Sequence, residues 1–153
     1  MVDVAPMDLV LLEDGEGNSV SISVLGEYPK SHDESELPPM LRALIVLETP
    51  FVGGREELPL WNSRLEEWAR ALDRLEAGED AGWMTMGSGL SLFIRLTGER
   101  DCPEVVLEEV NRSMVTVRVP IALPDGWIAD HRQRLRTLMD AWNPDGLAPR
   151  RTD

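Results

Sequence analysis

Short segments in which apolar and polar residues alternate constrain the fold of this chain more than any other feature. Residues 20–24 alternate valine or isoleucine with serine, and residues 115–121 place valine or isoleucine at every second position. A period of two puts all the apolar side chains on one face of a β-strand. Turn-forming residues separate such segments, as at 14–18 and 111–113. The chain therefore favours antiparallel hairpins with one buried face.

About seven strands are expected from this pattern. The segment 41–48 is apolar at consecutive positions from Ala43 to Leu47, which predicts a central strand covered on both faces. Pro120 lacks a ladder donor and belongs at a strand end or a sheet edge. The expected strands are 9–12, 20–24, 41–48, 83–86, 90–97, 104–110 and 114–121.

Two segments instead carry the helical period. Apolar residues recur at steps of four and three from Trp61 to Leu75, and Gly78 ends that helix, with Asn62 or Ser63 as its cap. The second helix follows Asp125-Gly126 and has the stripe Ile128, His131, Leu135, Leu138 and Trp142. Residues 49–60 are expected to be irregular. The predicted class is α+β, a mainly antiparallel sheet with both helices packed on it, in the order βββαββββα.

The length predicts a single domain over residues 1–153 with an ordered core over 8–142, an acidic loop over 26–40 and a frayed tail over 145–153. A domain of this size buries about two-thirds of its unfolded surface without disulfides or structural metals. Cys102 alone cannot form an intrachain disulfide, and residues 1–10 lack the pattern of a secretory signal. No apolar run is long enough to span a bilayer. We therefore expect a cytoplasmic protein with no membrane contact.

Negative charge is the strongest compositional bias. The formal net charge is −13, and residues 1–60 hold twelve Asp and Glu against three Lys and Arg, which gives −9 for that segment. Such a field repels the phosphates of nucleic acids and attracts basic proteins over long range. The charge predicts a basic protein partner and no direct nucleic-acid binding.

Neither a catalytic nor a metal-binding motif is complete. Asp14-Gly15-Glu16-Gly17-Asn18 begins like a calcium loop, but Ser19 replaces the required glycine and Leu25 the bidentate glutamate, so a hairpin turn is predicted. His32 lies among acids in a solvated loop, and Ser88 lies between two glycines in a turn. We expect no catalytic residue, no cofactor and no metal.

Two further side chains have structural interpretations. His131 lies on an apolar helix stripe, where a partly buried histidine held by a hydrogen bond is expected. Cys102 has acidic neighbours, which raise the pKa of a thiol and make it a poor nucleophile.

Candidate contact residues for a protein partner follow from the charge and the aromatic residues. Four of the five tryptophans have packing positions on the predicted helices. Trp83 starts a strand after a glycine-rich turn, and if exposed there it could anchor a partner. Phe51-Val52-Gly53-Gly54 is a candidate apolar loop tip. The predicted contact residues are Asp33, Glu34, Glu36, Glu56, Glu57 and Trp83.

The order of elements resembles a known group of proteins. Four features carry the resemblance: an apolar strand ending in Thr49-Pro50-Phe51-Val52-Gly53, the helix closing at Gly78, the segment 90–96 and the helix from Trp127 to Trp142. In this order the chain resembles small uncharacterised actinobacterial proteins. That group looks like WapI-type immunity proteins of polymorphic toxin systems. The resemblance covers residues 8–142. It implies a non-enzymatic inhibitor that binds a secreted toxin domain, and it assigns no functional residue. The terminal helix departs from the group in its basic start at 129–134.

Two alternatives stay open from the sequence. One is a carboxylate-based or metal-dependent enzyme, although the available pair, Glu108 and Glu109, is adjacent on a strand and points to opposite faces. The other is a self-associating structural protein that forms a homodimer through an exposed sheet face.

Overall fold

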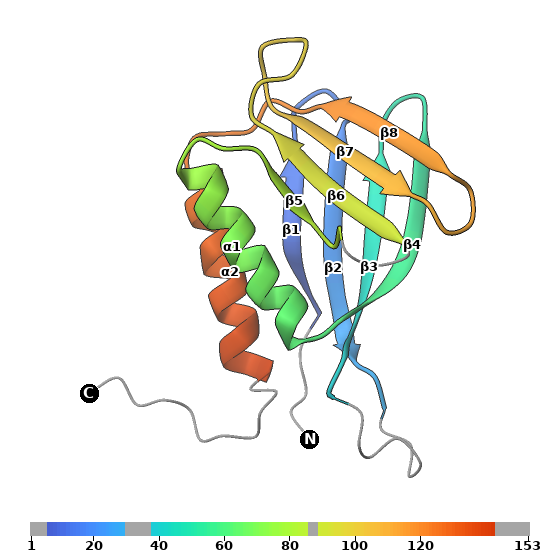
Figure 1. Cartoon of the computed structure of the whole chain (residues 1–153), viewed down its shortest axis with the longest axis vertical. Helices are drawn as coiled ribbons and strands as arrows, with labels where there is room; N and C mark the ends of the chain where they lie inside the picture. Colours follow the sequence, from blue (N-terminus) through green and yellow to red (C-terminus); the bar gives the residue numbers. More distant parts are fainter. Residues whose placement is uncertain (1–5, 30–37, 86–88, 143–153) are drawn as a thin grey trace.

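The computed structural model of the chain describes residues 6–29, 38–85 and 89–142. Within them, eight strands and two helices follow in the order ββββαββββα (Figure 1), which confirms the α+β class. The elements are β1 Met7–Glu13, β2 Ser19–Glu27, β3 Leu41–Glu48, β4 Gly53–Leu60, α1 Asn62–Glu76, β5 Ala81–Trp83, β6 Leu90–Arg95, β7 Glu104–Glu109, β8 Val115–Pro120 and α2 Trp127–Trp142.

The strands form two antiparallel sheets rather than one. The first has the order β1-β2-β3-β4 and the second the order β5-β6-β7-β8, and Figure 1 shows one in front of the other. Each sheet is apolar on one face, so stacking the two faces removes both from water. A single cluster of buried residues takes members from both sheets and both helices. The core therefore lies between the sheets and under the helices.

Strand β4 is absent from the sequence prediction, which expected residues 49–60 to be irregular. It pairs with β3 along its whole length, from Leu41 opposite Leu60 to Glu48 opposite Gly53. Leu58 and Leu60 are buried at its C-terminal half. Pro59 is compatible with β4 because an edge strand tolerates a residue without an N–H donor. Pairing with β3 and burial of two leucines outweigh the local preference of glycine and proline for loops.

Two further details differ from the sequence prediction. The inner residues of β3, such as Ile45, are buried, but Leu44 and Val46 on its other face are only half-buried. Strand β3 is therefore covered on one face. The N-terminal part of the expected acidic loop continues β2 up to Glu27, and the Tyr28 N–H donates to the Met40 carbonyl at 3.0 Å.

The helices lie side by side and cover one side of the stacked sheets (Figure 1). Helix α1 packs against β5 and helix α2 packs against β1. Their predicted apolar stripes are buried. The N-cap of α1 is Trp61 and makes no side-chain cap hydrogen bond, so the expected cap at Asn62 or Ser63 is wrong. Neither described helix is long and apolar enough to cross a membrane.

Candidate functional site

Helix α2 packs along β1 and hydrogen-bonds two of its backbone groups. The Leu11 N–H donates to Nε2 of His131 at 3.1 Å, and Nδ1 of His131 lies 2.6 Å from the Trp127 carbonyl, to which it donates. Arg134 Nη1 donates to the Asp8 carbonyl at 2.8 Å. Burial lowers the pKa of His131, which favours the neutral ring that can accept from Leu11. The predicted structural role of His131 is confirmed.

Helix α1 covers β5 in a similar way. Trp83 Nε1 donates to the Arg64 carbonyl at 2.8 Å, and the Trp83 ring stacks on Trp68 with centroids 4.7 Å apart. The Met84 N–H donates to the Glu67 carboxylate at 3.1 Å. Trp83 is 0% exposed, so its prediction as an exposed partner contact is wrong. The aromatic ring has its partners inside the molecule, on the helix that precedes β5 in the chain.

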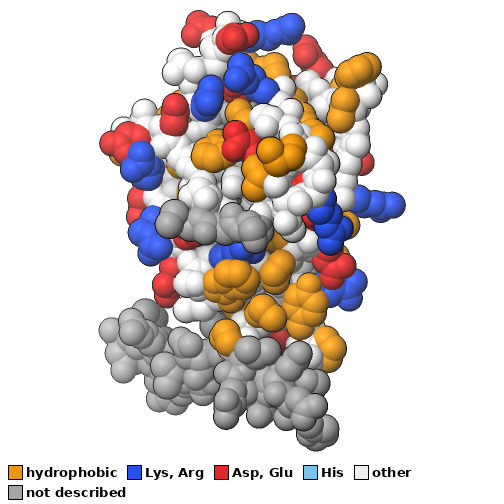
Figure 2. Space-filling view, turned by 45° about the vertical axis from the view of Figure 1, so that its right-hand side comes forward, with side chains coloured by type: hydrophobic (Ala, Val, Ile, Leu, Met, Phe, Trp, Pro, Cys, Tyr) orange, Lys and Arg blue, Asp and Glu red, His pale blue; other side chains and the backbone are white. Residues whose placement is uncertain are grey.

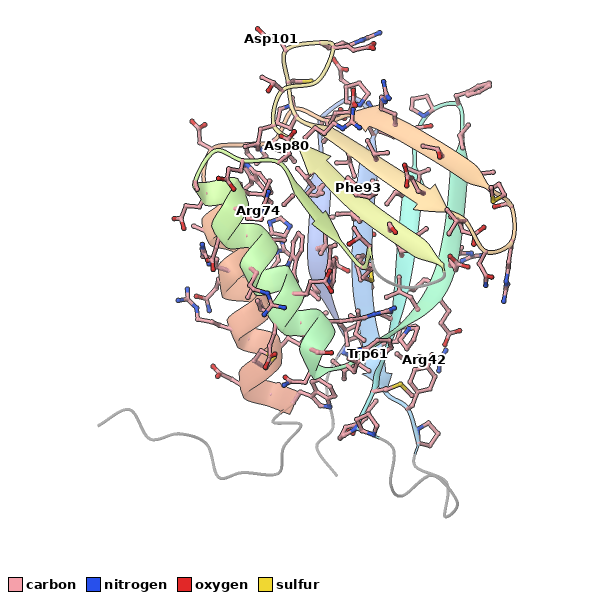
Figure 3. All side chains as sticks on the ribbon, in the orientation of Figure 1. Arg42, Trp61, Arg74, Asp80, Phe93 and Asp101 are labelled. Atoms are coloured by element: carbon pink, nitrogen blue, oxygen red, sulfur yellow. The ribbon has the colours of Figure 1, made fainter. Side chains whose placement is uncertain are left out.

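The turn from α1 into β5 is also held by polar contacts. Arg74 and Asp80 lie close together at this end of the helix (Figure 3), where Arg74 Nε donates to the Asp80 carbonyl at 3.3 Å. The Asp80 carboxylate accepts from the Leu96 N–H at 2.8 Å, which ties the turn to the end of β6. The helix-covered side is thus connected to both sheets.

The opposite side of the molecule has no such cover among the described residues. Strand β4 pairs only with β3 and β8 pairs only with β7. A groove of about 670 Å³ lies between these two sheet edges. It is lined by Ile45, Leu47, Val52, Gly53, Gly54, Arg55, Glu56, Glu57, Leu90, Leu107, Glu109, Arg112, Ser113, Val115 and Val117. We call this the edge groove.

The sequence of β4 explains why the edge groove is hollow. Side chains alternate along the strand, so Leu60, Leu58, Glu56 and Gly54 share the inner face. The first two are large and buried, whereas Gly54 contributes no side chain, and a Cβ built on it meets nothing within 4 Å. The sheets therefore lose contact toward the N-terminal half of β4.

Apolar side chains form the floor of the edge groove, and exposed apolar side chains lie in the turns next to it in the sequence. Ile45, Leu47 and Leu107 are nearly buried in its floor, with exposed fractions of 3%, 6% and 7%. Close by in the sequence, the β3–β4 turn carries Phe51, 96% exposed, and the β7–β8 turn carries Met114, 77% exposed. Figure 2 brings this side forward and shows hydrophobic side chains among scattered charged groups. The groove is a partly apolar surface open to solvent.

Two of the three carboxylates at the edge groove are already engaged. Glu109 accepts from the backbone N–H groups of Asn111, Arg112 and Ser113 and from the Ser113 hydroxyl, at 2.7–3.1 Å. These hydrogen bonds lower the pKa of Glu109 to about 2. Glu57 Oε1 lies 2.6 Å from Arg42 Nε. Glu109 thus holds the β7–β8 turn, and Glu57 is neutralised by its neighbour.

Glu56 differs from both. It lies opposite the buried Ile45 on the inner face of β4 and is half-buried. None of the hydrogen bonds or ion pairs among residues 6–29, 38–85 and 89–142 uses its carboxylate. Glu56 is therefore a groove carboxylate without a described partner.

A second hollow of about 660 Å³ continues from the edge groove toward the start of α1. The two share Glu56, Glu57, Leu90 and Arg112. At its far end, the Arg64 guanidinium lies 3.9 Å from the centroid of the Trp61 ring, and Arg64 Nη1 donates to the Pro59 carbonyl at 2.8 Å. Burial lowers the pKa of Arg64. This end of the surface is rigidly built.

The predicted contact residues divide into three groups. Glu56 and Glu57 both line the edge groove, and their side chains leave β4 on opposite faces. Trp83 is buried, as described above. Asp33, Glu34 and Glu36 lie outside the described residues, as do His32 and Ser88.

Sequence reasoning missed most of the groove. Gly54, Leu107 and Val115 come from three separate segments, and only pairing of β3 with β4 and of β7 with β8 brings them to one side. The glycine pair after Phe51-Val52 was the available signal, since it marks a strand start without side chains.

The other candidate sites have structural explanations. Asp14 Oδ1 accepts from the Glu16 and Asn18 N–H groups at 2.8 and 3.1 Å, which closes the β1–β2 turn in place of a calcium loop. Glu108 lies opposite Thr116 and Glu109 opposite Val115, so the two carboxylates occupy different faces of β7. In the part of the chain that the structure describes, no three His, Cys, Asp or Glu side chains are grouped to hold a metal ion.

The fold and the edge groove define a class: a small α+β domain with two stacked antiparallel sheets, helices over one side and a groove along the other. The chain belongs to the DUF5959 family, a family of unknown function whose model matches residues 7–143. Searches of curated proteins and of solved structures found no match.

Proposed function

We propose that this chain is a non-enzymatic protein-binding domain and that the edge groove is its binding surface. The observation that carries the proposal is a groove of about 670 Å³ with an apolar floor, lying between two sheet edges that no described helix covers. Exposed apolar surface of this kind is favourable to remove from water. Phe51 and Met114 supply large side chains for contact.

A more specific form of the proposal is a cytoplasmic antagonist of a basic toxin domain. The support is the net charge of −13, the concentration of acids in residues 1–60 and the resemblance to immunity proteins. A negative field speeds the encounter with a basic partner, whereas affinity depends on buried contacts at the centre of the interface. The acids supply the negative field, and the edge groove supplies the surface for buried contacts.

Partner capture with matched variants tests the protein-binding function. The double variant Phe51→Ser, Met114→Ser removes exposed apolar side chains of the two turns, each next to a lining residue in the sequence (Val52 and Val115). Leu25→Ser, 37% exposed on β2 and not part of the groove lining, serves as the control. We expect one protein to be captured from native lysate by the wild type and by Leu25→Ser and to be lost with the double variant. Identical capture by all three would refute the assignment of the groove.

The antagonist form has its own test. The product of the neighbouring gene is purified and its association rate is measured against the wild type and against a variant with Asp33, Glu34, Glu36, Glu56 and Glu57 neutralised. We expect association to slow several-fold at low salt and the difference to shrink at high salt. An unchanged association rate would remove the electrostatic part of this proposal.

A further inference from the structure

We propose that the partner binds in an extended conformation, as an added strand along the free edge of β4. An apolar side chain of that strand fills the hollow over Gly54, and a lysine or arginine of the strand pairs with Glu56. This inference rests on the proposed protein-binding function and specifies the chemistry of the partner.

The edges of the two sheets are not equivalent. The β1 edge is covered by α2, which bonds it through His131 and Arg134, and the β5 edge is covered by α1. The β8 edge carries Arg118, which is paired with Glu99 at 3.6 Å and Glu104 at 3.2 Å. Only backbone pairing with β3 is described for β4, so its other edge offers N–H and C=O groups to a new strand.

The usable length of the β4 edge is set by its sequence. Pro59 has no N–H, and Leu60 leads directly into α1, so the available edge runs over residues 53–58. At about 3.3 Å per residue this edge is roughly 20 Å long. A partner segment of six to eight residues matches that length.

The inner face of β4 favours an apolar residue of the partner strand. Gly54 lies opposite Leu47, and a Cβ at Gly54 has open space within 4 Å. The surrounding floor contains Ile45 and Leu107, both nearly buried. A valine or leucine delivered by the partner would cover these side chains and exclude water from them.

Glu56 indicates the charge of the partner residue that faces it. It is the groove carboxylate without a described partner, two residues from Gly54 on the same face. A half-buried carboxylate is stabilised by a cation that replaces part of its lost hydration. A second copy of this chain would bring a like groove carboxylate and a net charge of −13, so a basic partner is the better occupant.

Synthetic peptides test the inference directly. The probe is an eight-residue peptide that alternates valine and lysine, with a blocked N-terminus and a fluorophore. Its matched controls replace every lysine with glutamate or methylate alternate backbone nitrogens. We expect the lysine peptide to bind the full chain and to slow amide exchange in residues 53–58, with affinity about tenfold lower for the glutamate peptide. The methylated peptide should not bind because it cannot complete the ladder.

Variants of the protein locate the contacts. Gly54→Val fills the hollow and should abolish peptide binding, whereas Gly15→Val, at another glycine with open space around its Cβ, should not. Glu56→Gln should weaken binding about fivefold. Glu108→Gln, at a half-buried carboxylate of β7 that is not part of the groove lining, should leave it unchanged. Thermal unfolding of each variant verifies that it is folded.

Specific outcomes overturn the inference. Equal binding of the lysine and glutamate peptides, unimpaired binding by Gly54→Val, or slowed exchange along β8 instead of β4 would each contradict it. A concentration-dependent dimer that Gly54→Val dissociates would assign the groove to a second copy and also overturn it. If the peptides fail while partner capture still depends on Phe51 and Met114, the protein-binding function stands and the added-strand mode falls. If that capture is also unaffected by both substitutions, both proposals fall.

Discussion

The two lateral sides of the stacked sheets differ in whether a helix covers their edge strands. On the helix-covered side, α2 supplies His131 and Arg134 to the backbone of β1, and α1 supplies Glu67 to the backbone next to β5. On the open side, β4 and β8 end the sheets without a described helix against them. Unpaired sheet edges invite pairing with other chains, so an edge left open is a feature that needs a reason.

The contrast extends to packing. The helix-covered side buries Trp68, Trp83 and Trp142 with exposed fractions of 2% or less. The open side has glycine on the inner face of β4 and leaves Met114 and Val115 exposed. The largest buried side chains are therefore concentrated on the helix-covered side. Four measurements would break or sharpen this comparison.

Truncation of Trp68 should have the largest effect. Its ring is 1% exposed and stacks on Trp83, so Trp68→Ala should lower the free energy of unfolding by about 3–5 kcal/mol. Phe51→Ala on the open side should change it by less than about 0.5 kcal/mol. Urea denaturation of both variants measures the difference. Comparable losses would mean that the open side carries as much of the fold's stability as the helix-covered side.

Acid should weaken the helix-covered edge through His131. Its pKa is lowered from 6.5 by burial, so the unfolded chain binds the proton more readily than the folded one. The stabilisation is present above pH 6.5 and is lost as the pH falls toward and through the lowered pKa. We expect less stability at about pH 5.5 than at about pH 7.5, by at most about 1.4 kcal/mol, together with a lower protection factor of the Leu11 amide.

Two variants test whether His131 causes that pH dependence. His131→Gln should flatten the curve over this range, whereas His32→Gln, at the only other histidine of the sequence, should leave it in place. A slope that survives His131→Gln would show that α2 does not hold β1 through this ring.

A smaller, local effect is expected at the β7–β8 turn. The pKa of Glu109 is depressed to about 2, so its contribution is present above its ordinary value of 4.5 and lost as the pH falls through about 2. Glu109→Ala should speed amide exchange at Asn111, Arg112 and Ser113 without changing the helices. Glu108→Ala, on the other face of the strand, is the control. Equal exchange in both variants would contradict the role given to Glu109.

The smallest effect is expected for the ion pair on the outer face of β4. Arg42 and Glu57 are about half exposed, with 50% and 48% of their side chains accessible. Water and salt screen such a pair, so a double-mutant cycle should give a coupling below about 0.5 kcal/mol. A coupling above 1 kcal/mol would mean that the outer face of β4 is more rigid than its exposure indicates.

Elements with a strong period were predictable from the sequence, and elements without one were not. The stripe from Leu65 to Leu75 predicts α1, and the alternation over 115–121 predicts β8 up to its terminal Pro120. Strand β4 has two glycines, a proline and three charged residues, so no period marks it. Only its pairing partner β3 makes it a strand.

The candidate site was predictable from the sequence only in part. Glu56 and Glu57 were expected at a contact surface from charge alone, and both line the edge groove. Trp83 was misplaced because exposure depends on what packs over a residue, and here Trp68 of the preceding helix does so. The groove itself is a gap between segments that meet only in space.

The sequence by itself determined the fold class, the two helices, the antiparallel hairpins and the negative charge, because these depend on short-range periods and on composition. Tertiary structure decided the rest. It divided the strands into two sheets, placed both helices on one side and left β4 and β8 as open edges. The physical reason is that groups from other segments decide whether a sheet edge is covered. His131, for example, accepts a hydrogen bond from the Leu11 N–H, and no local sequence pattern predicts such a contact.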